Sequence, residues 1–116
     1  MIILEKAYAK AYGDYDKIVG GQPYEAIKDL SGGPGIQMKH DKISINDIWK
    51  RLFEANKYEY MMTGGTKMED TGKRIDGHQE GVTDEGIVLG HAYSILDMQE
   101  VKNEKILQLR NPWGQT

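Results

Sequence analysis

Two residues near the C-terminal end of the chain have the types and the spacing that proton-transfer chemistry requires. His91 follows Gly90 and enters a run of residues typical of a β-strand, and Asn111 ends the next such run. If the two strands pair as an antiparallel hairpin, the imidazole and the carboxamide lie at the same end of a sheet. The amide oxygen would then accept the imidazole N–H and fix the orientation and tautomer of the ring.

A histidine oriented by an asparagine is half of the nucleophile–histidine–asparagine arrangement used in nucleophilic catalysis. Trp113 follows Asn111 by two positions, where its indole would cover the hydrogen bond and exclude water. The same spacing also suits a histidine that has only a structural role, so the pattern alone leaves both interpretations open. The other two histidines, His40 and His78, lie in polar stretches typical of solvated loops.

Composition narrows the chemistry that this chain can perform. Its 116 residues include no cysteine, so it contains no thiol nucleophile, disulfide or thiolate metal site. The net charge, 15 − 18 = −3, offers no basic excess to a nucleic acid. No apolar run approaches the ~20 residues of a membrane span, and charged residues occur too early for a signal peptide. We therefore expect a cytoplasmic, intracellular protein with neither a nucleic-acid partner nor a membrane span.

The order of the expected elements predicts an α+β fold, in which N-terminal helices precede an antiparallel sheet. Apolar residues at three- and four-residue steps predict a first helix from Leu4 to Tyr15, with Gly13 expected to end it. A short second helix is expected between glycine-rich breaks, with Pro23 at its first position. The residues of that helix expected to face inward are Tyr24, Ile27 and Leu30.

The third helix has the clearest pattern. Ser44 with Asp47 resembles a capping box that begins the helix, and Asn56 or Lys57 should end it. The apolar face expected to be buried comprises Ile45, Ile48, Trp49, Leu52 and Phe53.

Three strands and one long loop are expected in the rest of the chain. A short strand over residues 58–63 should stop at Gly64-Gly65, and the polar stretch 64–86 should form a mobile surface loop. Strands over 92–98 and 106–110 should form a hairpin joined by a turn over 99–105.

Four segments, in the same order along the chain, resemble motifs of the calpain family of papain-like cysteine proteases. The run GHAYS at 90–94 resembles the family's histidine motif, and LRNPWG at 109–114 resembles its asparagine motif. The run LEKAYAK at 4–10 resembles the helix near the end of the cysteine-bearing lobe. Gly20-Gly21 together with DLSGG at 29–33 resembles the stretch that links the two lobes.

The resemblance implies a two-lobed fold in which one lobe carries the catalytic cysteine and the other the histidine and asparagine. Residues 1–19 would be the last helix of the cysteine lobe, and 20–35 a glycine-rich linker with a short helix. Residues 36–116 would form part of the His/Asn lobe, truncated at its C-terminus. Because the chain begins inside a helix without a capping residue, we expect it to be a piece of a longer protein.

The resemblance also assigns roles to individual residues. His91 would match the catalytic histidine, which deprotonates the thiol, Asn111 the residue that orients it, and Trp113 the tryptophan that shields the pair. Glu5 would match one calcium ligand of the calcium-dependent members. Its fellow ligands would precede Met1, so the resemblance implies that calcium could bind the complete core, and tight binding to this chain is not expected.

Two functions of different classes follow. The first is the His/Asn half of a calpain-like cysteine endopeptidase, which would act on protein or peptide substrates. It would be inactive alone and would need the missing cysteine lobe or another protein chain as its partner. The alternative is a non-catalytic calpain-like domain with a structural or interaction role in a larger assembly. The intact set of His91, Asn111 and Trp113 favours the first, because a non-catalytic domain has no chemical need for all three.

Overall fold

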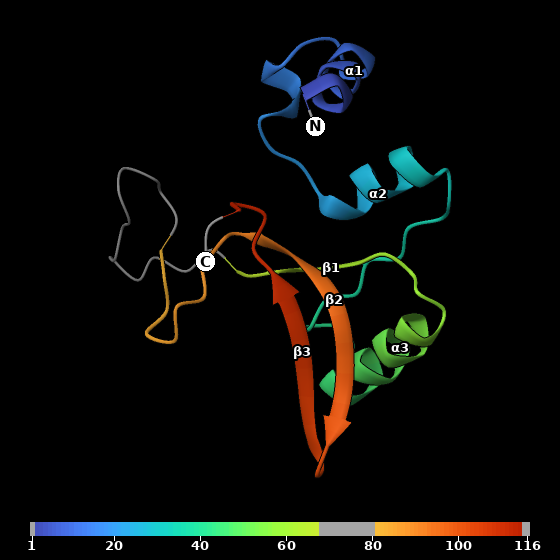
Figure 1. The fold of residues 1–116 in the computed structure, drawn as a ribbon, viewed down its shortest axis with the longest axis vertical. Coiled ribbons are helices and arrows are strands. Elements are labelled where there is room, and N and C mark those ends of the chain that lie inside the picture. The colour runs from blue at the N-terminus through green and yellow to red at the C-terminus, as the bar shows by residue number, and fades with distance from the viewer. Residues whose placement is uncertain (1, 68–80, 115–116) are drawn as a thin grey trace. The chain divides into compact units, whose positions relative to one another are not determined.

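The computed structural model describes residues 2–67 and 81–114, and the chain divides into two compact units, 1–37 and 38–116. The described residues of the first unit are helical, whereas those of the second contain a helix and an antiparallel sheet (Figure 1). This order confirms the α+β class expected from the sequence. Within the described ranges, no helix is both long enough and apolar enough to span a membrane.

The first unit contains α1 (Ile2–Tyr12), the 3-10 helix η1 (Asp16–Ile18) and α2 (Pro23–Ser31). Gly13 ends α1, as predicted, because its φ of 115° is incompatible with a continuing helix. The apolar pattern itself continues to Tyr15, three residues beyond the end of α1 at Tyr12. Helix α2 begins at Pro23, as expected, and Gly32 at its C-terminal cap has φ 71° and donates its N–H to the Lys28 carbonyl at 2.8 Å.

Helices α1 and α2 are linked through polar side chains. The hydroxyls of Tyr8 and Tyr12 both donate to the Asp29 carboxylate, with the Tyr8 contact at 3.3 Å. Ala9 is the only fully buried apolar residue among those described in this unit. The expectation that Leu30 faces inward was wrong, since this side chain is 57% exposed and lies in the last turn of α2, close to the cap at Gly32.

The second unit begins with α3 (Ile45–Lys57), whose start and end agree with the prediction. The Ser44 hydroxyl oxygen accepts the Asp47 N–H at 3.1 Å and donates to the Asp47 carboxylate at 2.6 Å. The face around Trp49 is buried as expected, but Ile45 is 63% exposed, which corrects the prediction. Ile45 is the first residue of α3, and the next residue, Asn46, accepts a hydrogen bond from Lys105 at 2.9 Å, so this end of the helix meets the hairpin through polar side chains.

The sheet has the order β1-β2-β3, with β1 (Met62–Gly65), β2 (Ala92–Val101) and β3 (Glu104–Arg110) all antiparallel to their neighbours. The predicted bounds of the first strand, 58–63, were wrong. Glu59 has φ 55°, which breaks an extended chain before Met62. Gly64 and Gly65 continue the strand instead of stopping it, because glycine retains the backbone groups that pair with β2.

The β2–β3 hairpin is present, but its turn is shorter than the predicted 99–105 segment. Only Lys102 and Asn103 lie between the strands, with φ of 50° and 68°. Positive φ at both central residues defines a type I′ turn, whose twist matches that of paired strands. The residues that flank this two-residue turn therefore stay paired in the two strands, and Glu100 of β2 pairs with Lys105 of β3.

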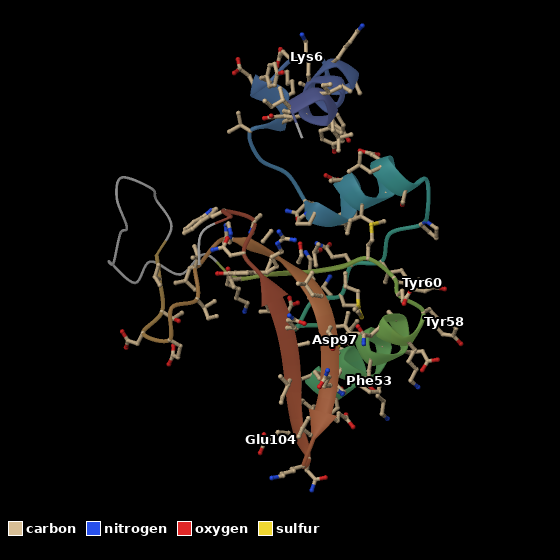
Figure 2. All side chains as sticks on the ribbon, viewed as in Figure 1. Lys6, Phe53, Tyr58, Tyr60, Asp97 and Glu104 are labelled. Carbon is tan, nitrogen blue, oxygen red and sulfur yellow. The ribbon has the colours of Figure 1, made fainter. Side chains whose placement is uncertain are left out.

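The core of the second unit lies between α3 and the sheet. Its buried residues Trp49, Ile95 and Met98 pack with the partly buried Leu52, Phe53 and Met62. Two polar contacts fix the helix to β2: Trp49 Nε1 donates to Glu100 at 2.6 Å, and Asn56 Nδ2 donates to Asp97 at 3.1 Å. Figure 2 labels Phe53 and Asp97 in the region where α3 faces β2.

The predicted loop over 64–86 is only partly described. Residues 68–80 lie outside the described residues, and Gly64 and Gly65 belong to β1. In the described remainder, Val82 forms a bridge with Val88. The start of this stretch is therefore part of the sheet, contrary to the expectation of a loop from residue 64.

Candidate active site

The hairpin register brings the two candidate site residues to one end of the sheet. Ser94 pairs with Arg110, so the residue that precedes β2 and the residue that follows β3 lie at the same end of the sheet. Those residues are His91 and Asn111, and Figure 1 shows the start of β2 beside the arrowhead of β3. The far end of the hairpin, where Figure 2 labels Glu104, holds the turn.

The predicted hydrogen bond between these residues is present. His91 Nε2 and Asn111 Oδ1 are 2.9 Å apart, and the Trp113 backbone N–H donates to the same oxygen at 3.2 Å. An amide oxygen can only accept, so Nε2 is the nitrogen that carries the proton in this contact. The second donor fixes the orientation of the amide, because turning it would place an NH₂ group against the Trp113 N–H.

Two aromatic rings surround the imidazole. The Trp113 indole lies 5.0 Å from it, centroid to centroid, and the Tyr93 ring meets it edge-on at 5.1 Å and 87°. Trp113 is 46% exposed, whereas Tyr93 is buried. The indole therefore covers one side of the ring while its own outer surface remains in solvent, and Tyr93 limits movement of the ring from within the sheet.

The turn that precedes His91 is held by groups that the sequence analysis did not identify. The Tyr93 hydroxyl accepts the Val88 N–H at 2.9 Å, and Thr66 bonds to the backbone of His91. In the sequence, Tyr93 stands out only as part of the run GHAYS at 90–94, and Thr66 lies in the stretch 64–86 that was predicted to be a loop. Thr66 reaches His91 only because β1 pairs with β2, so no local pattern could reveal its role. Tyr93 and Val88 are five positions apart, and no sequence motif marks their contact.

Glu5, the possible calcium ligand, lies in the first turn of α1 and is exposed. Across residues 2–67 and 81–114, no group of three or more histidine, aspartate or glutamate side chains could hold a metal ion. Calcium prefers six to eight oxygen ligands. The described residues therefore do not supply enough oxygen ligands for a calcium site.

Comparison with known proteins shows the family of this chain. The family model for calpain family cysteine proteases matches residues 1–116. Calpain-type cysteine protease ADL1 of Oryza sativa subsp. japonica is 37% identical over 97% of this chain. Calpain-12 of Homo sapiens is 37% identical and Calpain-8 of Rattus norvegicus 35% identical, each over 97% of this chain. The chain therefore belongs to the calpain family of cysteine proteases.

The matched region is a small part of each relative. It covers 5% of ADL1, 15% of human Calpain-12 and 16% of rat Calpain-8. The histidine and asparagine motifs both lie within the matched residues.

Proposed function

We propose that this chain supplies the His/Asn half of a calpain-like cysteine endopeptidase core. The observation that carries the proposal is the 2.9 Å hydrogen bond from His91 Nε2 to Asn111 Oδ1 beside the Trp113 indole. The family relationship supports a protease region, and this contact supplies the geometry that cysteine protease chemistry requires of its base.

The tautomer determines which nitrogen does the chemistry. Because Nε2 carries its proton toward Asn111, the lone pair of the neutral ring is on Nδ1. Nδ1 takes the proton of a cysteine thiol, which gives a thiolate and an imidazolium. The thiolate attacks the carbonyl carbon of the scissile peptide bond, and the imidazolium returns the proton to the leaving amine as the C–N bond breaks. Water then hydrolyses the thioester, with His91 accepting its proton and afterwards reprotonating the sulfur.

Asn111 suits every stage of this cycle. Nε2 keeps its proton in both the neutral and the protonated ring, so the hydrogen bond to Asn111 Oδ1 is compatible with both states. The Trp113 N–H, at 3.2 Å from that oxygen, prevents the amide from turning. A neutral amide also orients the ring without adding a negative charge that would compete with the thiolate for the imidazolium.

The nucleophile must come from elsewhere, because none of the 116 residues is a cysteine. We propose that residues 1–19 are the last helix of a cysteine-bearing lobe, that 20–35 link the lobes, and that 36–116 form most of the His/Asn lobe. The catalytic partner is the cysteine lobe, and the substrates are proteins or peptides.

Complementation tests the proposal. The chain is mixed with a recombinant calpain cysteine lobe, with and without calcium, and cleavage of an unfolded protein is followed. We expect cleavage that a thiol alkylator blocks and that His91→Ala abolishes. Asn46→Ala should retain it, because Asn46 lies in the first turn of α3 and its partner Lys105 lies beside the hairpin turn, away from His91. Formation of a folded complex without cleavage would overturn the proposal and favour a structural or interaction role.

A further inference from the structure

We propose that Thr66 is a positioning residue for His91: it fixes the backbone from which the imidazole projects. Only the catalytic consequence of this role rests on the proposed function. The positioning itself is a property of this chain and can be measured without any activity.

Thr66 binds both backbone polar groups of His91. The His91 N–H donates to Thr66 Oγ1 at 3.0 Å, and the Thr66 N–H donates to the His91 carbonyl at 3.0 Å. The first contact uses the side chain and the second uses the backbone. Together they hold the peptide groups on both sides of the His91 Cα. The direction of the Cα–Cβ bond, from which the imidazole projects, is therefore fixed.

The Thr66 hydroxyl also closes the turn that delivers His91. Oγ1 lies 2.7 Å from the Val88 carbonyl and 3.2 Å from the His91 carbonyl, so the shorter contact receives the hydroxyl proton. Val88 is 4% exposed, and its carbonyl therefore needs a partner within the protein. The Thr66 hydroxyl thus donates to the carbonyl of Val88, the first residue of the turn, and accepts the N–H of His91, the fourth.

A valine in place of Thr66 could fill the same space but could make neither hydroxyl bond. The neighbouring contacts hold other atoms of the turn: the Gly90 N–H donates to the Lys67 carbonyl at 3.1 Å, and the Val88 N–H donates to Tyr93. Neither reaches the His91 backbone. The hydroxyl of Thr66 is therefore the side-chain group that ties His91 to β1.

Thr66 is itself held by a regular element. It follows Gly65, the last residue of β1, and Gly65 pairs with Ala92 at the start of β2. The support for His91 thus comes from one edge of the sheet, and its hydrogen-bond partner Asn111 comes from the end of β3 on the other side of β2. Because the imidazole lies at the end of a side-chain arm, a small backbone rotation at His91 would lengthen the 2.9 Å bond to Asn111.

The test compares Thr66→Val, which removes the hydroxyl at similar volume, with Thr66→Ser, which keeps it. The matched control is Thr63→Val, an exposed threonine of β1 that pairs with Ser94. Nitrogen NMR on the full chain measures the tautomer of His91 and the exchange rate of its Nε2 proton with water. The methyl resonances of Ile95 and Met98 report on the integrity of the core.

We expect Thr66→Val to accelerate exchange of the Nε2 proton about tenfold, equivalent to about 1.4 kcal/mol, and to mix the two tautomers. Thr66→Ser and Thr63→Val should retain the wild-type values. Unchanged exchange in Thr66→Val with a native core would overturn the proposal. If Thr66→Val does not fold, Thr66→Ser still decides: altered His91 exchange in a variant that keeps the hydroxyl would overturn the role of the hydroxyl.

The complemented enzyme gives a second readout. Thr66→Val should lower kcat with little change in KM, because the hydroxyl acts on the backbone of His91, and Thr66→Ser should restore kcat. Absence of cleavage in the wild-type mixture would count against the proposed function and leave the NMR result to judge the positioning role. Equal loss of kcat in Thr66→Val and Thr66→Ser would overturn the proposal that the hydroxyl positions His91.

Discussion

The two units of this chain differ in how much of their structure is held by buried apolar side chains. Among the described residues, the first unit contributes one such side chain, Ala9, which is 2% exposed. The second unit contributes a larger set, comprising Ile48, Trp49, Val88, Tyr93, Ile95 and Met98. Large apolar residues of the first unit, such as Ile3 at 86% exposed, remain in solvent.

The candidate site lies entirely in the unit with the larger core. His91 and Asn111 are carried by two strands of one hairpin, and that hairpin packs on α3 through Trp49. The first unit is held mainly by surface hydrogen bonds, such as those from Tyr8 and Tyr12 to Asp29. The hydrogen bond between His91 and Asn111 therefore lies in the unit whose packed core restricts movement of the strands.

Trp49→Ala provides the most severe test of this comparison. The side chain is 9% exposed, packs against Ile95 and Met98, and donates to Glu100, so we expect a loss of about 3–5 kcal/mol in the free energy of unfolding. Urea unfolding followed by circular dichroism measures it. Tyr15→Ala in the first unit, at a side chain 52% exposed, should change stability by about 0.5 kcal/mol or less. Similar losses in both variants would contradict the contrast between the units.

Asn111→Ala separates the chemistry of the second unit from its stability. The variant removes the acceptor of His91 Nε2, so in the complemented enzyme we expect kcat to fall about 100-fold through misorientation of the ring. The unfolding midpoint should change little, since Asn111 lies after the last strand and outside the core. Asn46→Ala serves as the control. A fall in kcat matched by an equal loss of stability would indicate a structural role for Asn111 instead.

Asp97→Asn tests the polar link between α3 and β2. Hydrogen bonds from Asn56, then from Gln99 and the Met98 N–H, lower the pKa of Asp97 below its ordinary value of 3.8. A lowered pKa stabilises the fold above the ordinary value and loses that contribution as pH falls through the folded value. The variant should therefore be less stable than wild type at about pH 7, with the gap closing below about pH 3.8.

Urea midpoints at the two pH values measure this gap. Asn56→Ala removes the largest cause of the lowered pKa, so it should show the same pH dependence. A gap that stays constant as the solution is acidified would mean that the ionised carboxylate contributes nothing to the packing of α3 on β2.

The smallest effect is expected in the first unit. The hydrogen bond to Asp29, followed by that to Tyr8, raises the pKa of Tyr12 above its ordinary 10.0. Asp29→Asn should lower this pKa toward the ordinary value, as NMR of the labelled tyrosine rings in alkaline solution would show. A raised pKa gives a contribution that is present below pH 10.0 and lost as pH rises. Because the bonds to Asp29 are exposed to solvent, their loss in Asp29→Asn should lower the unfolding midpoint at neutral pH only slightly.

Glu25→Gln is the matched control within the same unit. The charge of Glu25, and then its hydrogen bond, raise the pKa of Tyr24. The variant should lower the pKa of Tyr24 and leave that of Tyr12 in place. If Asp29→Asn left Tyr12 unchanged, the bond between α1 and α2 would not exist in solution.

The sequence predicted the helices better than the strands. Gly13, Pro23 and Ser44 are local signals, and each marks a helix boundary as expected. Strand bounds depend on pairing, which local patterns do not contain. Gly64 and Gly65 looked like a stop but pair with β2, and the polar residues around Asn103 looked like a long turn but continue the ladder.

The sequence by itself predicted the contact between His91 and Asn111, because any antiparallel hairpin brings the start of its first strand to the end of its second, whatever the exact register. It also excluded a nucleophilic thiol from this chain, since composition needs no structure. Only the tertiary structure brought Thr66 to His91. Thr66 and His91 are 25 positions apart, and their contact depends on β1 pairing with β2 across a long connection. Long-range pairing of this kind is set by the free energy of the whole sheet, so no short stretch of residues reveals it.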